Sequence, residues 1–174
     1  PFSTKGCYMK MNIDGSVSVN MGGAEVGQGL RTIVRQIAAE ALKIAPERIR
    51  VYNEIDTQFS PYEWQTIGSM FTKQGGRAVK QACERAIRIL KETAAHPLRC
   101  EVELLDYDGE SVFLASDPTQ RIPLRQLVRG YMHENGIVVG EVAQATAAAR
   151  LPRYSGLDPV TGLGFAMQAD DDPS

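Results

Sequence analysis

Apolar and polar residues alternate in two short stretches near the start of the chain. The first stretch covers residues 9–13 and the second covers residues 17–21, with Asp14-Gly15 between them. Alternation with a period of two is typical of a half-buried strand. Glycine accepts the positive φ that a tight hairpin turn requires, so the pattern predicts an antiparallel hairpin.

Two longer stretches have the period of a helix. Over residues 30–42, apolar residues recur at i, i+3, i+4, i+7, i+8, i+11 and i+12, which places them on one helical face. Pro46 is predicted to end this helix. A second apolar face runs over residues 71–94, and His96-Pro97 is predicted to close that helix. Cys83 lies on this face and is predicted to be a core residue.

Shorter patterns predict the remaining elements. Residues 49–55 read as a half-buried strand, and Asp108-Gly109 lies between two strands of a second hairpin, over 101–105 and 111–114. A strand is expected from residue 137 toward 143. A short third helix is expected from the spacing of Leu124, Leu127, Val128, Tyr131 and Met132.

This order of elements predicts an α+β fold with two layers, in which the helices pack on one face of a mixed sheet. The predicted domain covers residues 1–146. Residues 147–174 are predicted to form an extended, poorly ordered tail, because this stretch is rich in proline and glycine and carries the acidic run 170–172.

Composition excludes several classes of protein. With 43% hydrophobic and 23% charged residues, the chain is not disordered as a whole. A net charge of -2 argues against a general nucleic-acid binder, and no apolar run approaches the roughly 20 residues that span a membrane. Three widely spaced cysteines without a pairing pattern indicate a reduced, cytoplasmic protein.

The first candidate site is the glycine-rich stretch before the first helix, which contains Gly27, Gln28 and Gly29. The helix lacks Ser, Thr, Asp or Asn at its expected cap, so its first amides need another partner, such as an anion or a polar ligand edge. The Gln28 amide can both donate and accept hydrogen bonds. The spacing matches neither a dinucleotide fingerprint nor a P-loop. A connector capped by water, with Glu25 as a solvated loop acid, remains the alternative.

The second candidate site is the long segment between residue 56 and the second helix. It has no clear period, and its aromatic residues Tyr62 and Trp64 are expected to anchor it in the core. Ser69 is a natural helix N-cap. Because both segments join a strand to a helix, we expect them to face the same side. His96 and His133 are both interpreted as helix-end residues, and no catalytic pair or triad is evident.

These two segments together resemble the molybdopterin-binding region of the xanthine dehydrogenase and aldehyde oxidoreductase family, the molybdenum hydroxylases. The Gly-Gln-Gly loop is followed by Thr32 and an apolar helix, as in that family. The similarity covers most of residues 8–95 and part of 154–168. It continues through Pro46, Ile49, Asp56-Thr57, Pro61 and the run from Thr66 to Thr72.

The resemblance implies a molybdopterin-type molybdenum cofactor. In this family the dithiolene sulfurs of the pterin hold the metal, so no metal-ligating side chain is expected. The family inserts oxygen derived from water at a carbon centre and passes electrons to iron-sulfur and flavin subunits or domains. The cofactor-binding residues that it implies are Gly27, Gln28, Gly29, Thr66, Gly68, Ser69 and Thr72.

The chain also departs from the family pattern. Met70 stands where the family often has arginine, and the late Gly-Val-Gly-Glu segment with the catalytic glutamate has no counterpart. We therefore expect part of a larger molybdenum subunit, inactive as an isolated chain and without a catalytic residue of its own. The remainder of that subunit is then an expected partner. The alternative is a non-catalytic interaction domain that has lost the cofactor.

Overall fold

A mixed sheet of four strands forms one layer of the protein. The computed structural model describes residues 4–68 and 70–150. The strands are β1 (Thr4–Met11), β2 (Val17–Met21), β3 (Ile49–Tyr52) and β9 (Gln144–Arg150), in the order β3-β2-β1-β9. β1 is antiparallel to β2 and β9, whereas β2 and β3 are parallel, so the predicted first hairpin and the mixed sheet are both confirmed.

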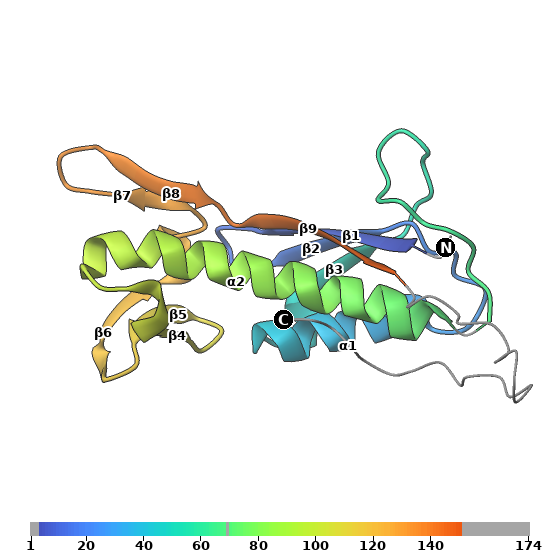
Figure 1. Ribbon diagram of the computed structural model, residues 1–174, viewed down its shortest axis with the longest axis horizontal. Coiled ribbons are helices and arrows are strands. Elements are labelled where there is room, and N and C mark those ends of the chain that lie inside the picture. The colour runs from blue at the N-terminus through green and yellow to red at the C-terminus, as the bar shows by residue number, and fades with distance from the viewer. Residues whose placement is uncertain (1–3, 69, 151–174) are drawn as a thin grey trace, which may run out of the picture.

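Two helices form the second layer, on one face of the sheet (Figure 1). They are α1 (Leu30–Leu42) and α2 (Gly76–Leu98), and a π-helical turn over Phe71–Gly75 precedes α2. Alternate strand residues are buried beneath them, as the period of two predicts. Cys83 is fully buried, and burial raises its pKa to about 12. The predicted α+β class is confirmed, and the cysteine is a core residue.

The predicted ends of three elements differ from the structure. β3 stops at Tyr52, and Ile55 lies in a loop with 63% of its surface exposed. α1 ends before Lys43, whose φ of 52° is left-handed, and Pro46 instead begins a short 3₁₀ turn. α2 continues through Pro97 to Leu98.

The middle of the chain forms two further small sheets. The first contains β4 (Leu105–Tyr107), β5 (Ser111–Leu114) and β6 (Asp117–Pro123), which confirms the second hairpin and adds a strand that the sequence pattern did not predict. The 3₁₀ turn over Val102–Leu104 precedes β4. The second sheet pairs β7 (Arg129–Met132) with β8 (Val138–Val142).

The predicted third helix is wrong. Only the 3₁₀ turn over Leu124–Gln126 forms, and the chain then enters β7. Gly130 has a φ of +86°, outside helical geometry, and β8 supplies the backbone partners of β7. His133 consequently lies in a hairpin turn, where its amide donates to the Ile137 carbonyl at 2.8 Å. His96 does lie in the last turn of α2, as expected.

Strand β9 crosses the predicted boundary between domain and tail. It pairs with β1 through Arg150, so residues 147–150 belong to the sheet. Buried and exposed residues alternate along β9, and its buried residues are all alanines, namely Ala145, Ala147 and Ala149. The rest of the predicted tail, with its glycine-rich loop, lies outside the described residues. No helix in the described ranges is long and apolar enough to cross a membrane.

Candidate functional site

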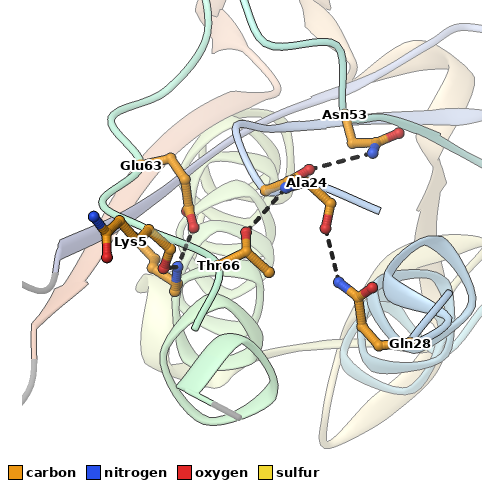
Figure 2. A network of polar contacts seen from close by, with 8 residues as sticks. Lys5, Ala24, Gln28, Asn53, Glu63 and Thr66 are labelled. Atoms are coloured by element: carbon orange, nitrogen blue, oxygen red, sulfur yellow. Dashed lines mark hydrogen bonds and ion pairs between the residues drawn. The ribbon is translucent and has the colours of Figure 1, made fainter. Parts of the chain in front are cut away.

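Two loops meet at one edge of the central sheet. The glycine loop (residues 22–29) follows β2, and the second loop (residues 53–68) follows β3. Because β2 and β3 are parallel neighbours, both loops leave the sheet at the same edge. The Ala24 amide donates to the Thr66 hydroxyl at 3.0 Å and joins the two loops (Figure 2). The expectation that both segments face one side is confirmed.

Asn53 is a second link between these elements. It is buried immediately after β3, and its amide donates to the Gly23 carbonyl at 3.2 Å. Its side-chain oxygen accepts from Nε of Arg31 in α1 at 2.5 Å. No local pattern in the sequence singles out Asn53 as a site residue. A polar residue directly after a strand that pairs in parallel is the signal that would have drawn attention to it.

Gln28 closes the glycine loop upon itself. Its Oε1 accepts from the Val26 amide at 2.7 Å. Its Nε2 donates to the Ala24 carbonyl at 2.8 Å (Figure 2). A carboxamide retains a second N–H and a second lone pair after these two bonds. Gln28 is exposed, so this remaining capacity faces outward. That it contacts a ligand stays a prediction.

Glu25 is an exposed loop acid, as the alternative interpretation held, and it also caps the glycine loop and α1. One carboxylate oxygen accepts from the amides of Gly27 and Gly29 at 3.0 and 3.1 Å, and the other accepts from the Arg31 amide at 3.4 Å. The helix has no capping side chain at Gly29 itself. Among the first amides of α1, that of Arg31 is therefore already partnered within the chain.

These hydrogen bonds lower the pKa of Glu25, although desolvation opposes them. A lowered folded-state pKa contributes stability above the unfolded pKa of about 4.3, and that contribution is lost as the pH falls through the folded value. We therefore expect the Glu25 carboxyl to titrate below an ordinary glutamate, with the Gly27 and Gly29 amide signals shifting together with it. Carboxyl and amide NMR titrations measure this, and Glu25→Gln removes the shared transition. A titration at or above about 4.3 would contradict the capping role.

A pocket of about 250 Å³ opens between the two loops and the start of the second helix. Four of the predicted site residues line it together, namely Gln28, Thr66, Gly68 and Thr72. Gly27 and Gly29 lie in the adjoining loop, with φ values of +99° and +78°, and Ser69 lies outside the described residues. The remaining lining residues are Val26, Ile33, Ile67, Met70 and Phe71.

The second loop is held by its backbone and not by its aromatic residues. Tyr62 is 66% exposed, so its predicted role as a core anchor is wrong, and Trp64 is only half-buried. Instead, the Gly6 amide donates to the Tyr62 carbonyl at 2.7 Å, and the Trp64 amide donates to the Thr4 carbonyl at 3.1 Å. The loop therefore runs beside β1 before it reaches the pocket.

The chemistry of the pocket is neutral. Its polar side chains are one carboxamide and two hydroxyls, and the remaining side chains are apolar. Within residues 4–68 and 70–150, no group of three or more His, Cys, Asp or Glu could hold a metal ion. Such a lining suits a flat polar heterocycle with mixed donors and acceptors more than a bare ion.

Comparison with known proteins identifies relatives along most of the chain. A family described as "Molybdopterin cofactor-binding domain" matches residues 1–165. Xanthine dehydrogenase/oxidase of Felis catus is 37% identical over 86 residues, which is 49% of this chain and 6% of that protein. The gamma subunit of the 6-hydroxypseudooxynicotine dehydrogenase complex of Paenarthrobacter nicotinovorans is 32% identical over 113 residues, covering 65% of this chain and 14% of that protein.

Solved structures show the same fold. CO dehydrogenase from Oligotropha carboxidovorans superposes with a TM-score of 0.71 at 23% identity, over 84% of this chain and 18% of that chain. Quinoline 2-oxidoreductase from Pseudomonas putida 86 does so with a TM-score of 0.70 at 22% identity, over 86% of this chain and 19% of that chain. The chain thus spans less than a fifth of each of these relatives.

Proposed function

The chain belongs to the molybdopterin cofactor-binding domain family, and from this premise we propose that its two loops form one wall of a molybdopterin site in a larger molybdenum hydroxylase subunit. The observation that carries the proposal is the meeting of the two loops at one pocket. The Ala24–Thr66 hydrogen bond joins them there, and Gln28, Thr66, Gly68 and Thr72 line the space between. We propose that the parent subunit is an oxidoreductase of the xanthine dehydrogenase and aldehyde oxidoreductase type.

The residues present fit a pterin. A pterin is a flat heterocycle with several donors and acceptors, and the pocket offers a carboxamide, two hydroxyls and apolar walls. A Cβ added at Gly27 or Gly29 would meet no atom within 4 Å, so the space beside the glycine loop is open to a ligand. When bound, the cofactor supplies the redox chemistry of its molybdenum centre. The residues of this chain hold and orient it.

The proposed partners are the remainder of the molybdenum subunit and iron-sulfur and flavin subunits or domains. Two relatives are named as a subunit gamma of a complex and as a large chain, which fits an assembly of several subunits. We propose a cytoplasmic location because Cys7 and Cys83 are buried as unpaired thiols. Burial raises the pKa of the Cys7 thiol, which keeps it protonated and unreactive.

Purification of two polypeptides tests this function. The parent subunit, expressed with the cofactor, is expected to contain about one molybdenum and one pterin per chain and to reduce a dye with an aldehyde or a purine. The 174-residue chain alone is expected to contain neither and to be inactive, because it spans only a small part of its relatives. Elemental analysis, pterin fluorescence and the dye assay measure these outcomes.

A non-catalytic interaction domain is the second candidate function. The observation that favours it is the exposed apolar surface of the second loop, where Phe59 is 79% and Ile55 63% exposed. A parent subunit that folds and assembles but retains no molybdenum would support this candidate and contradict the first.

A further inference from the structure

A buried ion pair joins β1 to the second loop. Lys5 of β1 is completely buried, and its ammonium pairs with the Glu63 carboxylate, whose side chain is only 9% exposed (Figure 2). The ammonium also donates to the Gln65 carbonyl at 2.9 Å. Burial raises the pKa of Glu63 against the opposing effect of Lys5 and Thr66. A lysine from the first strand thus holds two residues of the second loop.

This pair adjoins the groups that shape the pocket. Thr66, the next residue after Gln65, carries the hydroxyl that meets the Ala24 amide and also lines the pocket. The Lys5 ammonium lies 5.5 Å from the centre of the Phe71 ring, which forms another part of the lining. Lys5 therefore contacts the second loop on one side and the start of the second helix on the other.

We propose that Lys5 and Glu63 are positioning residues that hold Thr66 against the glycine loop and thereby set the shape of the pocket. The inference about the pocket as a cofactor site rests on the proposed function, whereas the link between the ion pair and Thr66 does not. The ion pair fixes the path of the second loop because the ammonium and the carboxylate must meet at defined atoms. An apolar pair of similar volume would fill the same space without fixing the position of Thr66.

The buried Lys5–Glu63 pair is expected to add little to the free energy of unfolding. Desolvation of two charges commonly offsets their attraction, and a buried ion pair can often be replaced by apolar residues without loss of stability. Removal of one partner is different, because it leaves an unpaired charge in the interior. Replacement of both partners together removes the ion pair without leaving a buried unpaired charge. Such a double variant therefore separates a positioning role from a purely structural one.

The test uses the double variant Lys5→Met/Glu63→Leu in the 174-residue chain. We expect its denaturation midpoint to stay near that of the wild type, while hydrogen exchange of the Ala24 amide becomes about tenfold faster, as the loss of one hydrogen bond predicts. Thr66→Val is the positive control, because it removes the acceptor of the Ala24 amide. Arg88→Gln/Glu92→Gln, which removes an exposed ion pair on α2, is the negative control and should leave the exchange unchanged.

Each outcome decides the proposal. Unchanged Ala24 exchange in the folded double variant overturns it. If the double variant does not fold, Glu63→Asp takes its place, because it keeps both charges and the ammonium–Gln65 hydrogen bond but shortens the carboxylate side chain by one methylene. Ala24 exchange is expected to become faster in this variant, and unchanged exchange likewise overturns the proposal.

A second arm measures molybdenum and pterin content in the parent subunit. The double variant is expected to retain about tenfold less cofactor, and Lys5→Arg, which preserves the pair, should retain the wild-type amount. Wild-type retention in the double variant would overturn the link from the ion pair to the cofactor site. If the wild-type parent itself holds no cofactor, the proposed function fails, and the exchange experiment still decides whether the pair positions Thr66.

Discussion

Replacement of Gln28 by alanine is expected to lower cofactor retention or kcat/KM of the parent subunit about 5- to 150-fold. The Gln28 amide bonds to Val26 and Ala24, and its remaining donor and acceptor face outward beside the pocket. A bound ligand would cover these groups, and loss of a covered polar partner costs about 1–3 kcal/mol. About 1.4 kcal/mol corresponds to a tenfold change, which gives the expected range.

Two comparisons separate this effect from a general loss of stability. Gln36→Ala removes a glutamine from the exposed face of α1, the helix that follows the glycine loop, and should leave both molybdenum content and turnover unchanged. In the 174-residue chain, Gln28→Ala should lower the free energy of unfolding by about 0.5–1.5 kcal/mol, because two exposed hydrogen bonds within the glycine loop are lost. This loss is small against the roughly 5–15 kcal/mol that stabilise a typical domain. Wild-type molybdenum content and turnover in the Gln28→Ala parent would contradict the assignment of Gln28 to the cofactor site.

Gly140→Ala is expected to destabilise the chain by about 2–5 kcal/mol. The φ of Gly140 is +81°, and a Cβ there would lie 2.2 Å from Oγ1 and 2.7 Å from Cβ of Thr93. A left-handed conformation costs a residue with a side chain about 1–2 kcal/mol, and overpacking adds about 1–3 kcal/mol. Thr93 is buried in α2, so the close approach of β8 to this helix depends on a glycine.

Gly136→Ala is the matched control for this prediction. Gly136 has nearly the same φ, +80°, but a Cβ there would meet no atom within 4 Å. Its expected cost is therefore the conformational one alone, about 1–2 kcal/mol. Urea denaturation of both variants measures the difference. Equal losses in the two variants would show that Thr93 moves aside without cost and would contradict the predicted clash.

Local patterns were sufficient for the elements whose signals lie within a few residues. The apolar spacing over residues 30–42 predicted the helical span of α1, although Pro46 does not end it, and the turns at Asp14-Gly15 and Asp108-Gly109 predicted two of the hairpins. The meeting of the two loops also followed from the chain order. Each loop joins a strand to a helix, and the two strands proved to be parallel neighbours.

Other features depended on partners distant in the chain. Apolar spacing over residues 124–132 fits a helix, yet β8 supplies hydrogen bonds that make the end of this segment, Arg129–Met132, a strand. The role of Asn53 is visible only in the folded chain, where its side chain forms hydrogen bonds with Gly23 and Arg31. The exposure of Tyr62 followed from the path of the second loop beside β1, where the Tyr62 backbone bonds to Gly6 and its side chain lies outside the core.

The sequence by itself determined the two helices, the first hairpin and the family resemblance, because each depends on periodicity, turn residues or a local motif. Only the tertiary structure decided how the pocket is built. Glu25 and Gln28 use their polar atoms within the glycine loop, and the Lys5–Glu63 pair joins residues 58 positions apart. Spacing along the chain carries no information about such long-range pairs, because a buried charge takes whichever partner the folded backbone brings within reach.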